Sequence, residues 1–178
     1  MRVPANEPAA IGRALDRGAA GVLVPLVGSA DETASAVAAC HHPPRGTRSY
    51  GPTRLAWAPL PADPLCIVMI ETLDAVEQAP AIAAVDGLDA VFVGPSDLAL
   101  SAGLPVTAQL ADPGFADLLR RVAAACRERG VPLGIYCASP AHVHRFRELG
   151  CTFFALMSET ALLRQAAAQR LAESRPGV

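Results

Sequence analysis

Two acidic residues, Glu71 and Asp97, stand at the ends of short apolar stretches that have the pattern of buried strands. The stretches, residues 65–72 and 90–98, are too short for helices and break abruptly onto a carboxylate, as parallel strands do at their C-terminal ends. Between them, residues 74–85 have the alanine-rich, amphipathic pattern of a helix. A strand–helix–strand crossover of this kind sets its two strands side by side. We therefore expect the two carboxylates to be neighbours.

Neighbouring carboxylates repel each other unless a cation lies between them. No lysine or histidine accompanies the pair in the sequence, and hard divalent cations are common partners of carboxylate oxygens. The pattern therefore favours a divalent metal site at Glu71 and Asp97. The alternative is that strand-end acids only cap the next helix, as Ser96 and Asp97 would do.

The composition limits the class of protein. The chain has 178 residues, enough for one domain with its own core. Its net charge is −2 and its arginines are scattered, so no basic run is present to bind nucleic acid. The apolar runs are short and interrupted, and residues 1–4 do not begin a signal peptide. We expect a cytoplasmic protein that binds neither nucleic acid nor membranes.

Lysine, cysteine and histidine usage limits the kinds of catalysis and metal binding that the chain could carry out. All fifteen cationic side chains are arginine, so a Schiff base on a lysine amine is impossible. The five cysteines form no C-x-x-C pair and lie mostly in apolar stretches, and we interpret them as reduced core thiols. None of the four histidines is predicted to bind metal; His142 and His144, two apart on a predicted helix, point to different faces.

Strands and helices alternate along the chain. No G-x-G-x-x-G turn follows a strand, so a dinucleotide-binding sheet has no support and a β/α barrel is favoured. Because a complete eight-unit barrel takes about 250 residues, we expect residues 1–178 to form a single TIM-barrel domain of six strand–helix units that is incomplete at its N-terminus. The predicted strands are 2–4, 21–27, 65–70, 90–93, 132–137 and 152–157, and the predicted helices are 7–17, 30–40, 74–85, 113–129, 140–149 and 160–173.

Five motifs, in order and at the right spacing, are similar to those of the HpcH/HpaI aldolase family of the phosphoenolpyruvate/pyruvate barrel superfamily. They are Arg2-Val3-Pro4, Gly18-Ala19-Ala20-Gly21-Val22-Leu23-Val24-Pro25, Pro43-Pro44-Arg45-Gly46-Thr47-Arg48, Ile70-Glu71-Thr72 and Gly94-Pro95-Ser96-Asp97-Leu98. The resemblance implies a class II aldolase that uses Mg²⁺, or else Mn²⁺ or Co²⁺, to stabilise the enolate of a 2-oxo acid such as pyruvate, with an aldehyde as partner. It also implies a homo-oligomer, a hexamer whose last helix packs on a neighbour.

The resemblance also assigns roles by position. Glu71 and Asp97 match the two metal-binding carboxylates, and Arg2 matches the arginine that contacts the keto oxygen. The turn at Gly94 and Ser96 would offer backbone N–H groups, together with that of Asp97, to the substrate carboxylate. Asp16 matches an aspartate that orients a catalytic histidine.

Three departures from the family pattern bear on these roles. Met69 stands where the family has a glutamine, so polar contacts near the metal should differ. Met157-Ser158-Glu159 stand where the family has a turn that contains glycine and aspartate, so the shape of the pocket there should differ. The family's histidine and tryptophan come from strands outside this chain, so no general base is assigned.

Arg45 and Arg48 are candidates for contact with a substrate acid or with a neighbouring subunit.

Two other functions stay open. A CoA-thioester lyase of the citrate lyase beta type would share the metal site but need basic contacts for its phosphates. A non-catalytic remnant, a barrel that lost its first strands, would bind metal without turnover or be insoluble. Because the chain opens on a predicted strand end, we also expect either a truncated gene or translation that begins upstream.

Overall fold

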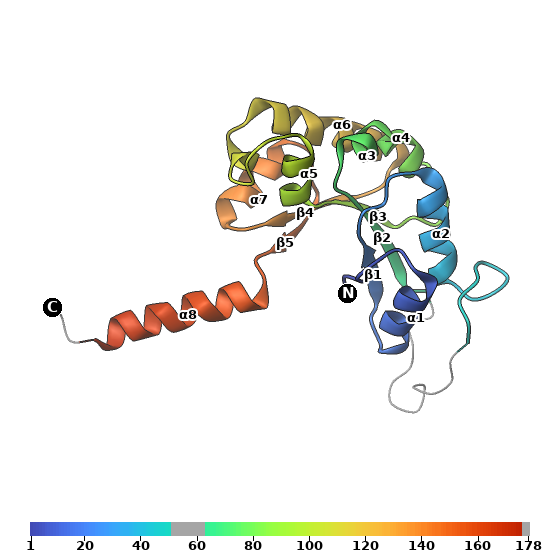
Figure 1. Cartoon of the computed structure of the whole chain (residues 1–178), viewed down its shortest axis with the longest axis horizontal. Coiled ribbons are helices and arrows are strands. Elements are labelled where there is room, and N and C mark those ends of the chain that lie inside the picture. The colour runs from blue at the N-terminus through green and yellow to red at the C-terminus, as the bar shows by residue number, and fades with distance from the viewer. Residues whose placement is uncertain (51–62, 176–178) are drawn as a thin grey trace.

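The computed structural model describes residues 1–50 and 63–175 of the chain. Its centre is one curved sheet of five parallel strands in the order β1-β2-β3-β4-β5, with helices along the outer side of the curve (Figure 1). This is the arrangement of part of a β/α barrel, and it confirms the predicted α/β class. The strands are β1 (Gly21–Val24), β2 (Leu65–Ile70), β3 (Ala90–Val93), β4 (Leu133–Cys137) and β5 (Phe153–Leu156).

The segment predicted as a first strand, residues 2–4, forms a single β-bridge instead. Arg2 pairs with Leu23 in parallel, and the Val3 N–H donates to the Leu23 carbonyl at 3.0 Å. The next bond of this parallel pattern would be donated to the Val3 carbonyl by residue 25, which is a proline and has no N–H. The described residues therefore contain five strands rather than the predicted six, and the rest of the predicted domain, residues 51–62 and 176–178, lies outside the described part.

Eight α-helices and a short 3₁₀-helix are described, where six helices were predicted. The predicted helix 74–85 is two short helices that meet at Gln78, because Pro80 has no N–H with which to continue the first one. A helix starting at Pro95 was missed, since the glycine and proline there were read as a turn alone. The helices are α1 (Pro8–Asp16), α2 (Ala30–Cys40), α3 (Leu73–Glu77), α4 (Ala79–Ile82), α5 (Pro95–Ser101), η2 (Ala108–Leu110), α6 (Pro113–Arg129), α7 (Pro140–Glu148) and α8 (Glu159–Ser174).

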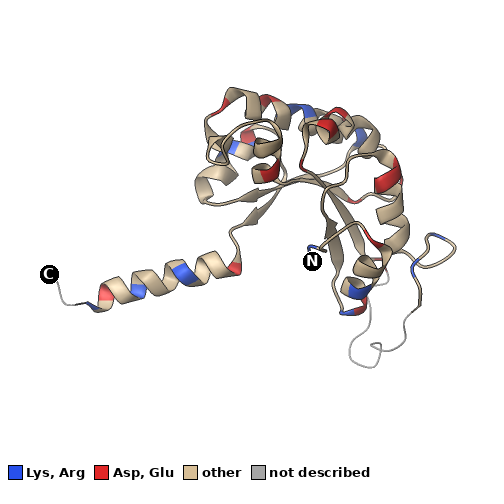
Figure 2. Cartoon of the chain, in the orientation of Figure 1, with Lys and Arg blue, Asp and Glu red and all other residues tan. Residues whose placement is uncertain are grey.

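The core lies between the sheet and the inner faces of the helices. Alternate strand residues such as Val68, Val91 and Ile135 are buried against this helical layer. In the outer layer, the rings of Phe115 on α6 and Phe146 on α7 lie 6.3 Å apart. All five cysteines are buried free thiols, as predicted. Figure 2 shows that charged residues lie mainly on helices, while the strands carry almost none.

The strand register brings the C-terminal ends of β2 and β3 together. Ile70 pairs with Val93, so Glu71 and Gly94 are the next residues along two adjacent strands. The same edge receives the ends of the other parallel strands. The residues predicted from the sequence to form the site, Glu71, Gly94, Ser96 and Asp97, therefore lie together at this edge.

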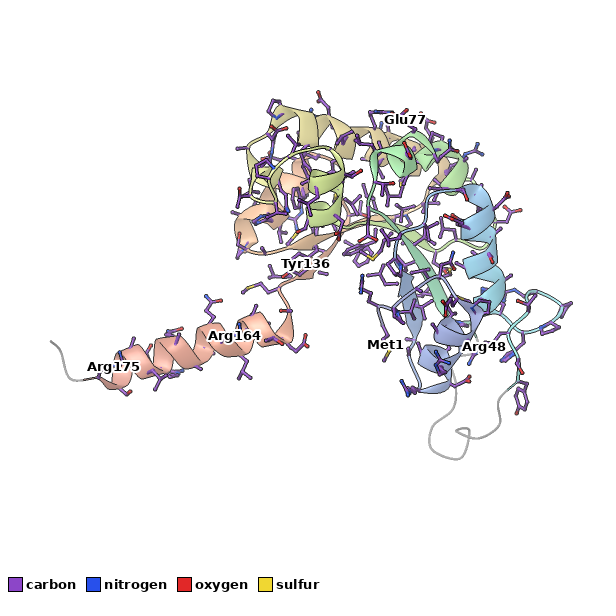
Figure 3. The ribbon with its side chains drawn as sticks, in the orientation of Figure 1. Met1, Arg48, Glu77, Tyr136, Arg164 and Arg175 are labelled. Atoms are coloured by element: carbon purple, nitrogen blue, oxygen red, sulfur yellow. The ribbon has the colours of Figure 1, made fainter. Side chains whose placement is uncertain are left out.

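Helix α8 projects away from the rest of the molecule (Figure 1). None of its residues is buried, and Arg164 on it and Arg175 just after its end lie far from the sheet (Figure 3). Among the helices of the described residues, none has the length and apolar character needed to cross a membrane.

Candidate active site

A cavity of about 340 Å³ opens at the C-terminal edge of the sheet, on its concave side. Five residues predicted for the site line it together: Arg2, Glu71, Gly94, Ser96 and Asp97. The remaining lining residues are mostly inward-facing strand residues, namely Leu23, Met69, Phe92, Pro95, Tyr136 and Ala155. The cavity thus combines a few polar groups with an apolar wall, as small-molecule sites commonly do.

Glu71 is the most constrained of these residues. It is only 2% exposed, and its Oε2 accepts a 2.7 Å hydrogen bond from the Leu26 backbone N–H. Leu26 has φ 53°, an uncommon conformation for a residue other than glycine. Its side chain is 68% exposed, so packing of that side chain does not account for the conformation. The turn after β1 instead directs an N–H at the buried carboxylate.

Burial raises the pKa of the Glu71 carboxyl, and the nearby Asp97 carboxylate adds to this effect. The Leu26 N–H and the guanidinium of Arg2 act in the opposite direction and lower the pKa. The net shift is upward, which means that the described residues alone do not fully compensate the buried charge. Another cation at this position would do so.

Gly94 makes room for Glu71. A Cβ built on Gly94 would lie 2.4 Å from Glu71 Oε1, too close for any other residue. The Gly94 N–H donates to the Ile70 carbonyl at 3.2 Å, so it is already engaged in the sheet. Of the three N–H groups expected to face the substrate carboxylate, those of Ser96 and Asp97 are left.

Asp97 lies in the first turn of α5 and is exposed. The helix begins at Pro95, with Gly94 at the N-cap position, and no side chain in the described structure caps its N-terminus. The alternative that Ser96 and Asp97 serve only as a helix cap is therefore wrong. Arg2 reaches the cavity from the other side, where the Leu23 N–H donates to the Met1 carbonyl at 2.9 Å and fixes the segment beside β1.

Asp16 does not line this cavity. It ends α1, shortly before β1 begins, and so lies at the opposite edge of the sheet from Glu71. Its Oδ1 accepts a 2.7 Å hydrogen bond from Arg48, whose side chain is 3% exposed. Asp16 and Arg48 thus pair with each other away from the cavity. Arg45 also has a partner away from it, since it pairs with Asp63 at 2.9 Å.

The donors present suit a hard divalent cation. Glu71 and Asp97 supply carboxylate oxygens, which Mg²⁺ and Mn²⁺ prefer. No group of three or more histidine, cysteine, aspartate or glutamate side chains that could hold a metal occurs in residues 1–50 and 63–175. The side chain of Met69, which lines the cavity, has no oxygen to offer. A metal here would therefore have two protein ligands and open positions for water and substrate.

Two features of the site were not predicted. Tyr136 on β4 faces the concave side of the sheet (Figure 3) and lines the cavity; strand alternation would have indicated this orientation. The Leu26 turn had no sequence signal, because leucine is not expected at positive φ. Met157 has φ 59° and lies just before α8, but neither it nor the following residues line the cavity.

Comparisons with known proteins agree with this geometry. The family model described as HpcH/HpaI aldolase/citrate lyase matches residues 1–166. The chain is 36% identical to 5-keto-4-deoxy-D-glucarate aldolase of Klebsiella pneumoniae, over 98% of this chain and 70% of that protein. It is 36% identical to hydroxypyruvate/pyruvate aldolase of Roseovarius nubinhibens, over 98% and 71%. The crystal structure of an HpcH/HpaI aldolase/citrate lyase family protein from Burkholderia cenocepacia superposes with a TM-score of 0.84 at 32% identity, covering 98% of this chain and 72% of that one.

Proposed function

Because the chain belongs to the HpcH/HpaI aldolase/citrate lyase family, we propose that it is a metal-dependent class II aldolase that forms or cleaves a carbon–carbon bond between a 2-oxo acid and an aldehyde. Its named relatives are aldolases, which are carbon–carbon lyases. The observation that carries the proposal is the convergence of Glu71, Asp97 and Arg2 on one cavity. We also propose that residues 1–178 belong to a single domain, part of a β/α barrel.

In this proposal Glu71 and Asp97 hold a divalent cation, Mg²⁺ or alternatively Mn²⁺ or Co²⁺. When bound, the cation would supply a Lewis acid for the negative charge that develops on the keto oxygen of the 2-oxo acid. The fixed position of Glu71, set by the Leu26 N–H and by the space at Gly94, would orient the ligand oxygens before substrate arrives. Such preorganisation is what an electrostatic site needs.

Arg2 and the start of α5 would bind the 2-oxo acid itself. The guanidinium of Arg2 offers fixed hydrogen-bond donors to the keto oxygen, and the backbone N–H groups of Ser96 and Asp97 are available to the carboxylate. Leu23 and Phe92 form an apolar wall beside these groups, while Arg2 and Asp97 remain exposed to solvent. No general base is assigned, because no histidine is among the residues that line this cavity.

The cavity favours a free 2-oxo acid over a CoA thioester. A CoA thioester brings several phosphate groups, which proteins usually bind with clustered cations. The described lining contains one cation, Arg2. Assays with acyl-CoA substrates and with free 2-oxo acids discriminate the two functions.

We also propose a homo-oligomer, a hexamer by family resemblance, in which α8 packs on a neighbouring chain. The support is the exposure of apolar residues on α8: Leu162, Leu163 and Leu171 are 49%, 72% and 59% exposed. Exposed leucines grouped on a helix that stands apart from its own chain are typical of a surface that contacts another protein.

The deciding experiment measures pyruvate binding and aldol turnover with and without metal. We expect pyruvate to bind only when Mg²⁺ or Mn²⁺ is present, and any cleavage of an aldol adduct to stop on addition of a chelator. Borohydride added with pyruvate should trap no adduct, because the chain has no lysine. Metal binding without pyruvate binding would identify a non-catalytic remnant, and a trapped adduct would contradict the class II assignment.

A further inference from the structure

A second cavity of about 330 Å³ adjoins the first one and shares Ser96 and Tyr136 with it. Its other walls come from the segment around η2, between α5 and α6, and from the connection between β4 and α7. It therefore lies at the same edge of the sheet. The residues that complete its lining are Val106, Thr107, Gln109, Leu110, Ala138 and His142.

Gln109 places an amide in this second cavity. It is 8% exposed, and its Nε2 donates a 3.3 Å hydrogen bond to Ser96 Oγ. The side chain is thus anchored to the residue that the two cavities share. Among the described residues no group donates to its Oε1, so this oxygen can accept a hydrogen bond from a ligand.

The side chain of His142, like that of Gln109, is held in place by contacts with its neighbours. Ser139 Oγ and His142 Nδ1 are 2.8 Å apart, and the ring of Phe146 contacts the imidazole edge to face, with centroids 5.6 Å apart. Burial lowers the pKa of His142, so the imidazole is neutral at physiological pH. The ring therefore offers an uncharged polar group rather than a cation.

The two cavities differ in charge. The first contains Arg2, Glu71 and Asp97, whereas the described lining of the second has a phenol, two hydroxyls, an amide and a neutral imidazole, with no arginine and no carboxylate. A carboxylate or phosphate placed there would lose its hydration without gaining a cation. Hydroxyl groups would instead find both donors and acceptors.

We propose that the second cavity binds the uncharged, hydroxyl-bearing end of the substrate, so that the aldehyde partner is a small neutral hydroxyaldehyde rather than a semialdehyde acid or a phosphate ester. This inference rests on the proposed function, because it takes the 2-oxo acid to occupy the first cavity. The shared residues Ser96 and Tyr136 allow one molecule to extend from one cavity into the other.

A direct test compares threitol with tartrate, which share a four-carbon hydroxylated skeleton and differ in the charge of their ends. The full chain is titrated with each while the imidazole C2 protons are followed by NMR, and His142→Leu assigns the signal of His142. We expect threitol to shift this signal with a Kd at least fivefold lower than that of tartrate. Equal or tighter binding of tartrate, or no shift with threitol, would overturn the proposal.

Variants show whether the contact is the one proposed. Gln109→Leu should weaken threitol binding at least fivefold, and Gln109→Arg should reverse the preference in favour of tartrate. If the buried Gln109 variants do not fold, Thr107→Val removes one exposed hydroxyl without a change of shape and should weaken threitol binding at least twofold. His144→Leu is the matched control, because His144 is exposed on the same helix and lines neither cavity. Threitol affinity that is unchanged in the lining variants would overturn the proposal.

Pyruvate binding in the presence of Mn²⁺, measured by calorimetry on the same samples, separates the two proposals. If pyruvate binds and tartrate is preferred to threitol, the neutral subsite is wrong and the proposed function stands. If pyruvate does not bind, the proposed function fails, and with it the assignment of the second cavity to an aldehyde, whatever threitol does.

Discussion

The backbone N–H of Leu26 donates a 2.7 Å hydrogen bond to Oε2 of Glu71, and this contact holds a nearly buried carboxylate at the edge of the sheet. The two residues come from turns that follow adjacent strands. One N–H does not offset the desolvation of the carboxylate, since the pKa of Glu71 is still raised by burial. The described residues therefore hold the Glu71 carboxylate in place but do not fully compensate its negative charge.

The first prediction concerns pH. A carboxyl whose pKa is raised in the folded state binds its proton more tightly there than in the unfolded chain. Without metal, the contribution of Glu71 to the free energy of unfolding should therefore fall as pH rises from its ordinary pKa of 4.5 through the raised folded value. The stability of the unmodified chain minus that of Glu71→Gln, from urea unfolding at several pH values, measures this contribution. A difference that does not change with pH would contradict the prediction.

Metal binding should show the opposite dependence. A divalent cation binds the ionised carboxylate, so the apparent affinity for Mn²⁺ should increase as pH rises through the same range, with release of protons on binding. Calorimetry in two buffers of different ionisation enthalpy measures the protons released.

The second prediction concerns the ligands. Glu71→Gln and Asp97→Asn keep the size of each side chain and remove its charge, and each should weaken Mn²⁺ binding by about 100-fold, since one of only two carboxylates is lost. Asp74→Asn is the control, because Asp74 is an exposed acid only three residues from Glu71 and does not line the cavity. Unchanged Mn²⁺ affinity in both site variants would remove the basis for the metal site.

The third prediction concerns Gly94. A methyl group at this position would meet Glu71 Oε1 at 2.4 Å and Glu71 Cγ at 2.8 Å, so Gly94→Ala should displace the carboxylate and weaken Mn²⁺ binding by about tenfold or more. In Gly12→Ala, by contrast, the added methyl group meets no atom within 4 Å. That control, inside α1, should raise stability by about 0.5–1 kcal/mol. Equal metal affinities in the two variants would contradict the steric role of Gly94.

The fourth prediction separates a structural from a catalytic role for Asp16. Asp16→Asn would leave the buried guanidinium of Arg48 without its carboxylate, which should cost about 3 kcal/mol of stability, the low end for such a change because Asp16 is partly exposed. Metal and pyruvate binding should not change. Asp117→Asn breaks the exposed pair with Arg120 and should cost less than about 1 kcal/mol. If Asp16→Asn leaves stability intact and abolishes turnover, the catalytic role expected from resemblance is correct.

Much of this site could be predicted because its residues follow strands with clear patterns. The apolar stretches before Glu71 and Asp97 are buried parallel strands, and their adjacency follows from the crossover between them. Helix α6, bounded by Pro113 and the left-handed Gly130, was placed correctly by its pattern and its end signals.

The parts that could not be predicted depend on tertiary contacts or on ambiguous local signals. The left-handed conformation of Leu26 serves a carboxylate 45 positions away, and no local propensity indicates it. Gly94 and Pro95 are turn residues by composition, yet they start a helix, since proline is well accepted in the first helical turn. The ion pair of Asp16 depends on Arg48, a residue from a distant loop. The second cavity is lined by residues of α5, η2 and α7. No single sequence motif includes residues of all three helices, so this cavity could not be predicted.

The last prediction concerns α8, whose residues are all at least partly exposed. An isolated helix of this length is marginal in water, and full burial of a leucine contributes about 1.5–3 kcal/mol, so we expect α8 to be stabilised by contact with another copy of the chain. Light scattering after size exclusion should give a mass that is a multiple of 18.4 kDa. Introducing charge with Leu163→Glu and Leu171→Glu together should shift the mass toward that of one chain and reduce the helical signal in circular dichroism. Gln165→Glu adds a charge to the same helix at a residue that is already polar, and should leave the mass unchanged. A single-chain mass for the unmodified protein, with α8 still helical, would show that the helix needs no neighbour.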